Sequence, residues 1–262
     1  MRIDLYLAEK GLAESRSRAQ AMIAGGMVSV NGKTVTKPAF AVTEADNVVL
    51  TDTLKFVSRG GEKLLGAIQL FGLNVSGLTC VDIGASTGGF TDCLLKNGAK
   101  HVYAVDCGTD QLHPLLRNDP RVTVFEQTNA RTLSSELLGE QCELAVMDVS
   151  FISQTLLYPA VIATLTDSGR LISLIKPQFE TTAKALGSGG ILRNSREHVR
   201  VLEDVVKKAE GYGLILTALA RSPIKGGDGN REYLAVFGLG EDSKKQRLLL
   251  SKDFLSKLTN NQ

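Results

Sequence analysis

The stretch Cys80-Val81-Asp82-Ile83-Gly84-Ala85-Ser86-Thr87-Gly88-Gly89-Phe90 decides the fold. It starts as a short apolar run that ends in an acid, and it continues as a glycine-rich turn. Residues 90–95 then have the apolar spacing of a helix. This order predicts a strand, a loop and the first turn of a helix. Small residues let a ligand approach the backbone, and a helix N-terminus offers it unpaired N–H groups. We therefore expect a nucleotide-like ligand here.

The spacing of the small residues separates two classes of nucleotide ligand. A dinucleotide-binding turn needs glycine at its first, third and sixth positions, whereas this turn has Ser86 in the middle position. The carboxylate of Asp82 would also repel a pyrophosphate. The same carboxylate suits the ammonium group of S-adenosylmethionine, and the pattern D-x-G-x-x-x-G is similar to the cofactor loop of Rossmann-like methyltransferases. The sequence favours S-adenosylmethionine, and the alternative is a structural turn with a solvated acid.

A second acid supports the S-adenosylmethionine hypothesis. Residues 101–105 predict a second strand, and Asp106 at its end would hold the ribose hydroxyls. Residues 121–125 predict a third strand, and Asn129 beyond it lies where it can reach the adenine. The expected cofactor-binding residues are Asp82, Gly84, Ala85, Ser86, Gly88, Gly89, Phe90, Asp106 and Asn129.

The composition is typical of an ordinary globular protein. The chain has 262 residues, enough for one large domain or a large and a small one, with 43% hydrophobic and 22% charged residues. No apolar run reaches the roughly eighteen residues of a membrane span, and acids stand near the N-terminus in place of a signal-peptide core. We expect a cytoplasmic protein without membrane association. The cysteines are widely spaced and are expected to be buried thiols: Cys80, Cys93, Cys107 and Cys142.

Positive charge is concentrated near the start of the chain. The net charge of +2 is too small to indicate a nucleic-acid partner, but residues 1–40 hold six basic groups and three acids. Apolar spacing predicts a helix over 2–10 and a second helix that Ser15 caps and Gly25-Gly26 ends. The dipeptide Asn31-Gly32 between short apolar runs predicts a tight hairpin.

Three motifs of this segment occur in the order found in S4 domains. They are Arg2-x-Asp4-x-Tyr6-Leu7, residues 15–20 (SRSRAQ) and residues 26–33 (GMVSVNGK). The segment resembles an S4 domain, a small module that docks on structured RNA. The resemblance implies contacts to phosphates, which position RNA without reading its sequence. The expected RNA-binding residues are Arg2, Arg16, Arg18, Lys33 and Arg59, and the alternative is a solvated charged face.

The rest of the chain alternates strands and helices as a doubly wound α/β domain does. Further strands are predicted over residues 142–147, 170–175, 214–219 and 233–237, with a helix over 196–210. Pro177 is expected to end regular structure after the fifth strand. The expected domains are an S4-like α+β domain over 1–52, a linker over 53–59, a Rossmann-like class I methyltransferase sheet with helices on both faces over 60–240, and a tail with helical spacing over 241–262.

Five charged residues are predicted to lie at one edge of this sheet. Ligands of open α/β sheets bind at the carboxyl ends of the parallel strands. Asp148 and Lys176 directly follow predicted strands, as Asp82 and Asp106 do. Glu232 precedes a strand and reaches the same edge only if that strand runs antiparallel. Taken alone, each residue also fits a structural role, such as a helix cap for Asp148 or a surface cation for Lys176.

Six motifs are spread over the chain: residues 58–64 (SRGGEKL), 82–92 (DIGASTGGFTD), 105–106 (VD), 148–152 (DVSFI), 176–180 (KPQFE) and 229–232 (GNRE). With them, the chain from about residue 1 to 240 resembles the TlyA family of ribosomal RNA 2′-O-methyltransferases, also labelled hemolysins, whose catalytic domain is similar to the FtsJ type. The resemblance implies ribosomal RNA or a ribosomal subunit as the partner and a cytidine as the modified nucleotide. It implies a catalytic set of Lys63, Asp148, Lys176 and Glu232.

This catalytic set suits methyl transfer to a ribose hydroxyl. A 2′-hydroxyl is a weak nucleophile until its proton is removed or polarised, while a methyl sulfonium is already activated. Lys176 can act as the base if partial burial or the cation of Lys63 lowers its pKa, and it stabilises the alkoxide if it stays charged. Asp148 and Glu232 would orient the two ammonium groups. The reaction requires no metal, and no cluster has metal-ligand spacing.

Two other functions compete with methyl transfer. One is a membrane-lytic hemolysin, for which residues 248–258 are the amphipathic candidate because Leu250, Phe254 and Leu258 share a helical face. A stripe this short is expected to pack on its own domain. The other is an RNA-binding protein with an inactive catalytic domain, and the intact catalytic set argues against it. The sequence does not define the oligomeric state.

Overall fold

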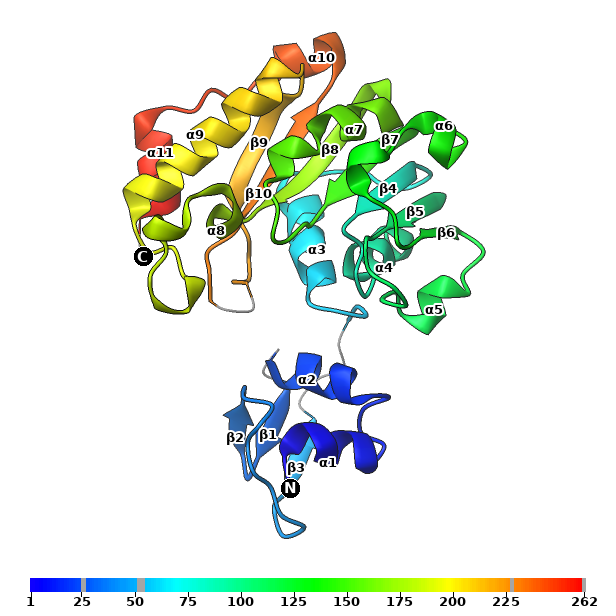
Figure 1. Ribbon diagram of the computed structural model, residues 1–262, viewed down its shortest axis with the longest axis vertical. Helices are drawn as coiled ribbons and strands as arrows, with labels where there is room; N and C mark the ends of the chain where they lie inside the picture. Colours follow the sequence, from blue (N-terminus) through cyan, green and yellow to red (C-terminus); the bar gives the residue numbers. More distant parts are fainter. Residues whose placement is uncertain (25–26, 51–54, 227–228, 261–262) are drawn as a thin grey trace. The chain divides into compact units, whose positions relative to one another are not determined.

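The computed structural model describes residues 1–24, 27–50, 55–226 and 229–260 (Figure 1). The chain divides into two compact units, Met1–Arg59 and Gly60–Gln262, which we call the N-terminal unit and the C-terminal unit. The glycine pair expected to end the second helix and the domain boundary expected near residue 52 lie outside the described residues. Within the described ranges, no helix combines the length and the hydropathy that a membrane crossing requires.

The N-terminal unit combines two helices with a small antiparallel sheet in the order β2-β1-β3. Its elements are α1 (Ile3–Glu9), α2 (Arg16–Ala24), β1 (Val28–Val30), β2 (Lys33–Val35) and β3 (Val48–Leu50). Buried side chains of the helices and strands form one core, which includes Ile3, Leu7, Ala19, Ile23 and Val28. The unit is an α+β module, as the sequence predicts.

Local sequence signals explain the hairpin and the start of α2. Strands β1 and β2 are joined by Asn31 and Gly32, whose φ angles are 52° and 75°. A two-residue turn of this kind requires a positive φ at both positions, which asparagine and glycine tolerate. The Ser15 hydroxyl accepts the N–H of Arg18 at 3.2 Å and so caps α2. The sequence pattern does not predict β3, because three residues are too few to show an alternation.

The C-terminal unit is built on a seven-stranded sheet in the order β6-β5-β4-β7-β8-β10-β9 (Figure 1). Its strands are β4 (Thr79–Ile83), β5 (His101–Val105), β6 (Val122–Phe125), β7 (Cys142–Met147), β8 (Leu165–Ile175), β9 (Ile215–Arg221) and β10 (Tyr233–Gly238). Neighbouring strands from β6 to β8 are parallel, whereas β10 is antiparallel to both β8 and β9. The carboxyl ends of the parallel strands and the start of β10 therefore share one edge.

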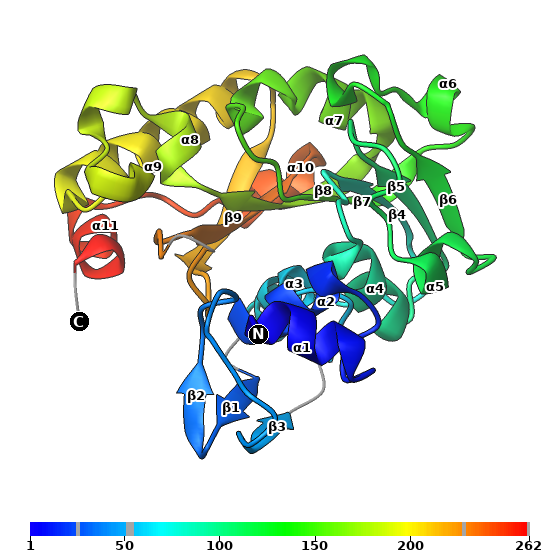
Figure 2. The same cartoon turned by 60° about the horizontal axis from the view of Figure 1, so that its bottom comes forward.

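Helices cover both faces of this sheet, with α3 and α4 on one face and α7, α8 and α9 on the other (Figure 2). The helices are α3 (Gly60–Leu70), α4 (Gly89–Lys96), α5 (Pro114–Arg117), α6 (Ser135–Leu138), α7 (Tyr158–Thr164), α8 (Pro177–Glu180), α9 (Ser195–Gly211), α10 (Gly240–Lys245) and α11 (Lys252–Thr259), with 3-10 turns η1 (Ala130–Thr132), η2 (Gln154–Leu156), η3 (Ala183–Ala185) and η4 (Ser188–Gly190). Buried residues of α7 and α9 pack with those of the strands in one hydrophobic core. This is the Rossmann-like sheet with helices on both faces that the sequence predicts, and its last strand is antiparallel.

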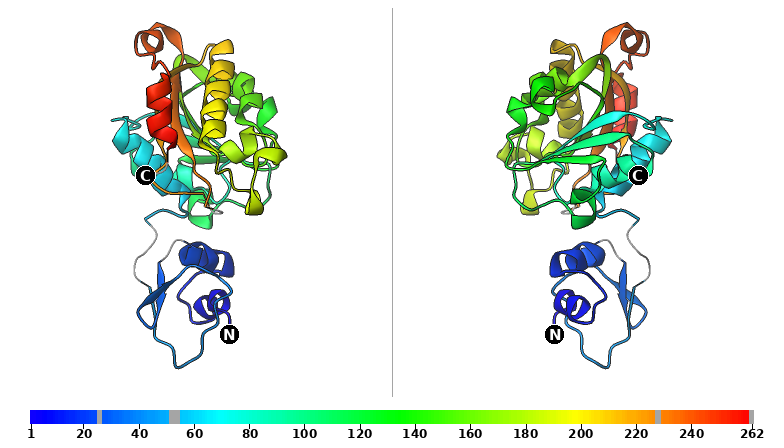
Figure 3. Two further views of the ribbon diagram at one scale, coloured as in Figure 1. Left: turned by 90° about the vertical axis from the view of Figure 1, so that its left-hand side faces the viewer. Right: turned by 90° about the vertical axis from the view of Figure 1, so that its right-hand side faces the viewer.

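The tail of the chain packs on the C-terminal unit. Helix α11 lies beside α9 (Figure 3). Its Leu255 has no exposed surface, and Leu250, Phe254 and Leu258 pack against the main core. The expected apolar stripe is therefore part of its own domain, as the sequence predicts.

Three predictions of detail are wrong. Pro177 is the first residue of α8, because the fixed φ of proline suits the first helical position and its missing N–H has no partner there. Cys107 is exposed, since it stands in the loop just beyond β5. Strand β8 starts at Leu165, well before the predicted residue 170.

Candidate active site

Charged side chains gather at the carboxyl edge of the sheet. Asp82 lies in β4, while Asp106, Asp148 and Lys176 directly follow β5, β7 and β8. Glu232 directly precedes β10. Because β10 is antiparallel to β8, with Tyr233 opposite Ile175, its start reaches the edge where Lys176 lies.

Two lysines and two acids of this edge form close ion pairs. Lys63 Nζ lies 2.5 Å from Oε2 of Glu232, and Lys176 Nζ lies 2.6 Å from Oδ1 of Asp148. The ammonium of Lys176 also donates to the Ser150 hydroxyl at 2.8 Å. The exposed fractions of the four paired side chains are only 3% to 19%. Charged groups this buried cost free energy unless they are paired, so neither pair is an ordinary surface contact.

The two pairs form one electrostatic cluster. Burial raises the pKa of Glu232, the cations of Lys63 and Lys176 oppose this shift, and Asp148 adds to it. The carboxyl group of Glu232 therefore interacts electrostatically with both lysines. Lys63 lies in the first turn of α3, where the helix dipole disfavours a cation, and Glu232 compensates for this position. In the described part of the chain, no group of three or more histidine, cysteine or acidic side chains is placed to hold a metal ion.

The acid before the glycine turn is buried and incompletely hydrogen-bonded. Asp82 has no exposed surface, and its Oδ2 accepts the N–H and the hydroxyl of Thr91 at 2.9 and 2.7 Å. Among the described residues, its Oδ1 has no hydrogen-bond partner. Burial raises the pKa of Asp82 to about 7 against the hydrogen bonds from Thr91, and Asp148 and Asp106 add to the shift. A buried carboxylate with an unpaired oxygen fits a cationic group of a ligand.

Close packing explains the glycines of the turn. Gly84 has a φ of 83°, and a Cβ there would lie 2.9 Å from the carbonyl oxygen of Asp148. Gly88 has a φ of 91°, and a Cβ there would collide with Leu116. Both positions therefore exclude larger residues. The remaining predicted turn residues Ala85, Gly89 and Phe90 are buried.

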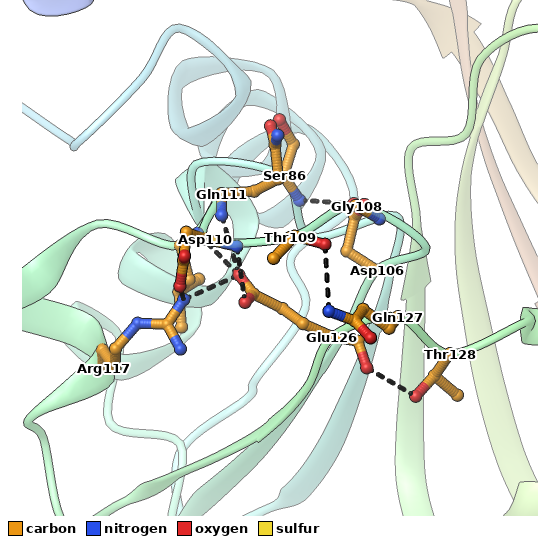
Figure 4. A network of polar contacts seen from close by, with 11 residues as sticks. Ser86, Asp106, Gly108, Thr109, Asp110, Gln111, Arg117, Glu126, Gln127 and Thr128 are labelled. Carbon is orange, nitrogen blue, oxygen red and sulfur yellow. Dashed lines mark hydrogen bonds and ion pairs between the residues drawn. The ribbon is translucent and has the colours of Figure 1, made fainter.

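Asp106 fixes the tip of the turn. Its Oδ2 accepts the N–H of Ser86 at 2.8 Å, and its Oδ1 accepts the N–H of Gly108 at 2.7 Å (Figure 4). Ser86 has a φ of 48°, which is unfavourable for a residue other than glycine. The hydrogen bond to Asp106 stabilises this conformation. Asp106 thereby ties the first loop of the site to the second.

Glu126 is a further residue of this region that the sequence analysis does not predict. It directly follows β6 and accepts the backbone N–H groups of residues 110–112 and the guanidinium of Arg117 (Figure 4). The hydrogen bond from Arg117 is the main reason that its pKa is lowered to about 2. Glu126 therefore shapes the loop after Asp106. Its place directly after a predicted strand, like that of Asp106, is the signal that could have found it.

Asn129 lies at the start of η1 and is exposed. Its Oδ1 accepts the N–H of Arg131 at 3.0 Å, so it acts as a helix cap in this structure. Its predicted contact with an adenine stays a prediction.

Phe151 is an exposed aromatic residue beside the charged cluster. Its side chain is 91% exposed, and its φ of 63° is unfavourable for an aromatic residue. Its ring centroid lies 5.1 Å from that of Phe179, and Lys176 Nζ lies 6.0 Å from the centroid of Phe179. The sequence analysis does not predict this aromatic pair. The place of Phe151 three residues after Asp148, in the loop that follows a predicted strand, is the sequence signal for it.

In the N-terminal unit, two of the predicted RNA-binding residues share one buried acid. Arg2 and Arg16 donate to the carboxylate of Asp4 at 2.9 and 3.0 Å, and Asp4 has no exposed surface. The arginine side chains are themselves 45% and 51% exposed. Asp4 therefore offsets part of the positive charge of Arg2 and Arg16. A count of basic and acidic residues in the sequence does not reveal this pairing.

The other predicted RNA-binding residues have different surroundings. Arg18 donates to the backbone carbonyl of Val57. Lys33 is exposed at the start of β2, beside the hairpin turn, and Arg59 is half-buried. Their contact with RNA stays a prediction.

The strand order with an antiparallel β10, together with the glycine turn after β4, defines the C-terminal unit as a methyltransferase of the Rossmann-like class, preceded by a small α+β domain. Residues 56–239 match the FtsJ-like methyltransferase family, and residues 1–48 match the S4 domain family. The chain belongs to the TlyA family of FtsJ-like methyltransferases.

Three relatives illustrate this membership. The chain is 44% identical over 238 residues to hemolysin A of Brachyspira hyodysenteriae, covering 90% of this chain and 99% of that protein. It is 42% identical over 234 residues to the 16S/23S rRNA (cytidine-2′-O)-methyltransferase TlyA of Mycobacterium tuberculosis, covering 88% of this chain and 87% of that protein. A solved structure from Streptococcus thermophilus that carries a hemolysin label is similar with a TM-score of 0.77 and 39% identity, covering 99% of this chain and 94% of that one.

Proposed function

We propose that this protein transfers a methyl group from S-adenosylmethionine to the ribose 2′-hydroxyl of a cytidine in ribosomal RNA. The observation that carries the proposal is the cluster of Lys63, Asp148, Lys176 and Glu232 at the edge that also holds the glycine turn. The relative from Mycobacterium tuberculosis, whose name states cytidine-2′-O methylation of 16S and 23S rRNA, supports the choice of substrate.

The glycine turn and the acids beside it would hold S-adenosylmethionine. Oδ1 of Asp82 is buried and has no hydrogen-bond partner among the described residues, so it suits the ammonium of the amino-acid part of the cofactor. Asp106 suits the ribose hydroxyls, and Asn129 the adenine. When bound, this cofactor supplies a methyl group on a sulfonium, which needs no further activation.

Lys176 is the residue that we assign to the 2′-hydroxyl. A neutral lysine amine has two N–H donors and one lone pair. One N–H donates to the Ser150 hydroxyl and Nζ lies 2.6 Å from Oδ1 of Asp148, which positions the amine with its lone pair available to the substrate. Nζ then accepts the proton of the 2′-hydroxyl and makes its oxygen a stronger nucleophile. If Lys176 instead stays charged during the reaction, it stabilises the alkoxide as a cation.

Lys63 and Glu232 would maintain the charge balance of the site. Their pair is buried, so removing either partner leaves an uncompensated charge close to the reacting groups. We assign to Glu232 the orientation of the Lys63 ammonium, and to Lys63 the compensation of the acids in the cluster.

Phe151, supported by the half-buried Phe179, would form a platform for the target base. A base that is turned out of the RNA can stack on an aromatic side chain, which contributes about 1–3 kcal/mol. Phe151 is exposed and lies in the same loop as Asp148. Its positive φ costs on the order of 1–3 kcal/mol, and strain of this kind is concentrated at functional sites. We infer that the fold holds Phe151 outward for contact with RNA.

The N-terminal unit would bind the RNA away from the target ribose. Arg16 contacts Asp4 through Nε, and the remaining N–H groups of its guanidinium are suited to a phosphate. Arg18, on the same helix, and the exposed Lys33 belong to the same proposed surface. Arg2 and Arg59 complete the predicted set.

Membrane lysis and RNA binding without catalysis are the competing functions. The hemolysin labels of two relatives suggest the first, but the apolar residues of α11 are used in the core of the C-terminal unit. The paired lysines and acids argue against the second. Leakage of liposomes with purified protein would favour lysis, whereas labelled methyl transfer to ribosomal subunits would favour our proposal.

The deciding experiment maps ribose methylation on 16S and 23S rRNA from cells with and without this protein. We expect a cytidine to lose its 2′-O-methyl group in cells that lack the protein. Purified protein with S-adenosylmethionine should restore that group on unmodified subunits. Identical methylation maps, with no transfer to the subunits, would overturn the proposal.

A further inference from the structure

Two loops carry half of the proposed catalytic set and the aromatic pair. The β7 loop, residues 148–154, contains Asp148 and Phe151, and the β8 loop, residues 176–180, contains Lys176. The alignment of these groups depends on how the two loops are held against each other. The ion pair between Asp148 and Lys176 joins the loops where they leave the sheet.

A second link joins the far ends of the loops. Glu180, the last residue of α8, accepts the hydroxyl of Ser153 at 2.6 Å and the backbone N–H of Gln154 at 2.8 Å. Burial raises the pKa of Glu180, and these hydrogen bonds oppose the shift. A carboxylate that is drawn into a partly buried position to make two hydrogen bonds is suited to fixing a loop.

The end of the β7 loop is anchored in turn to the sheet. Gln154 is 1% exposed, and its Oε1 accepts the hydroxyls of Ser173 and Tyr158. Ser173 belongs to β8, so Gln154 is fixed to the strand that leads into the β8 loop. Glu180 adds the remaining connection, because it joins the anchored end of the β7 loop to the end of the β8 loop.

The backbone at Phe151 lies between the two links. Its φ of 63° persists only if the surrounding structure holds it in place. The link at Asp148 precedes Phe151 in the chain, and the link at Glu180 acts just after it. Without the second link, we expect the β7 loop to relax toward a negative φ and to move Phe151 and Ser150 away from Lys176.

We propose that Glu180 is a positioning residue for methyl transfer, which fixes the β7 loop against Lys176 through Ser153 and Gln154. The catalytic part of this inference rests on the proposed function. The link between the loops does not, and it can be measured without any methyl transfer.

The test compares Glu180→Ala and Glu180→Gln in the full chain with Glu203→Ala, a matched control on the exposed face of α9. Hydrogen exchange of the amides of residues 150–156 reports the link directly. We expect faster exchange in Glu180→Ala and a kcat that is about 10 to 100 times lower, with little change in the Kd for S-adenosylmethionine. Glu180→Gln keeps one acceptor oxygen and should lie between Glu180→Ala and the wild type.

Ser153→Ala, which removes the partner hydroxyl, provides an independent route to the same answer if Glu180→Ala folds poorly. Its effect on kcat should not add to that of Glu180→Gln, because both changes weaken one link. Exchange or kcat equal to that of the control would overturn the inference, and so would a loss of cofactor binding in proportion to kcat. Failure of the wild type to methylate any RNA would instead overturn the proposed function, since the exchange comparison needs no activity.

Discussion

Asp4 in the N-terminal unit and Asp82 in the C-terminal unit are both completely buried carboxylates, but their surroundings are opposite. Two arginines and a glutamine bind Asp4, and their hydrogen bonds, above all those from Arg2, hold its pKa well below the ordinary range. Asp82 receives hydrogen bonds from Thr91 alone among the described residues, and burial raises its pKa to about 7.

The contrast separates a structural acid from a site acid. A buried carboxylate that the protein's own cations satisfy stabilises the fold and has little left for a ligand. A buried carboxylate without a cation opposes folding until a cation arrives, because its ionised form has lost water without compensation. The acids paired with Lys63 and Lys176 are intermediate, since each has a cation beside it but both pairs belong to one electrostatic cluster. This ranking predicts how each group responds to substitution.

The largest effect is expected for Lys176→Ala. If the cluster serves the reaction, methyl transfer should fall about a thousandfold or more, with S-adenosylmethionine still bound, because the group that acts on the 2′-hydroxyl is gone. If the cluster is structural, like the one around Asp4, Lys176→Ala should destabilise the fold and should not cause a selective loss of methyl transfer. Transfer of labelled methyl groups and thermal unfolding separate the two cases. Lys207→Ala, an exposed lysine on α9, is the matched control.

A smaller effect is expected for Asp82→Asn, which removes the charge and keeps an oxygen for Thr91. We expect the affinity for S-adenosylmethionine to fall about a hundredfold, as when one partner of a buried ion pair is removed. Isothermal titration calorimetry measures this loss. Unchanged affinity would place Asp82 with Asp4 among the structural acids.

The same variant makes a prediction for pH. The pKa of Asp82 is raised from 3.8 to about 7 in the folded protein, so its contribution to stability is fully present below pH 4 and is lost as the pH rises through about 7. The loss is on the order of 4 kcal/mol for a shift of this size. Asp82→Asn lacks this dependence. Urea unfolding should therefore find the variant stabilised relative to the wild type at pH 8 and not at pH 4. Parallel pH profiles would contradict the assignment.

The sequence predicts much of the fold because its signals are local. An acid after an apolar run marks the carboxyl end of a strand, and parallel strands bring such ends together, which explains why Asp106 and Asp148 could be placed at one edge. Glu232 can reach the same edge only if β10 runs antiparallel to its neighbour, and β10 is indeed antiparallel to β8. Asn31 and Gly32 likewise determine their turn without help from the rest of the chain.

Other features depend on contacts that no local pattern contains. The partner of Lys63 is 169 residues away, and the sequence places both only near the same edge. The burial of Asp4 depends on how α1 and α2 pack, so its effect on the two arginines is invisible to residue counting. The positive φ of Phe151 depends on links to another loop. Pro177 ends the strand, as the sequence predicts, but it also begins α8, because proline suits the first position of a helix.

A fourth prediction concerns Arg16, which would contact both Asp4 and RNA. Changing Arg16 and Arg18 to alanine should weaken RNA binding about tenfold, and the slope of log K against log salt should decrease by roughly 1.5 if both contact phosphates. A decrease of about half that size would mean that Asp4 already saturates Arg16. Lys244→Ala with Lys245→Ala, which removes the same charge from α10, is the control. An unchanged slope would argue against an RNA-binding role for these arginines.

The smallest effect, and the one of opposite sign, is expected for Asp4→Asn. The lowered pKa of Asp4 means that its contribution to stability is present above its ordinary pKa of 3.8 and is lost as the pH falls below it. At pH 8 the variant should therefore be less stable than the wild type, where Asp82→Asn is more stable. Hydrogen exchange of the amides of α1 and α2, compared at pH 8 and pH 4, measures this in the full chain. The difference from the wild type should shrink in acid, because the carboxylate of Asp4 in the unfolded wild-type chain then begins to take up a proton. A stabilised Asp4→Asn at pH 8 would mean that the arginines do not compensate for its burial, and that the two acids are of the same kind after all.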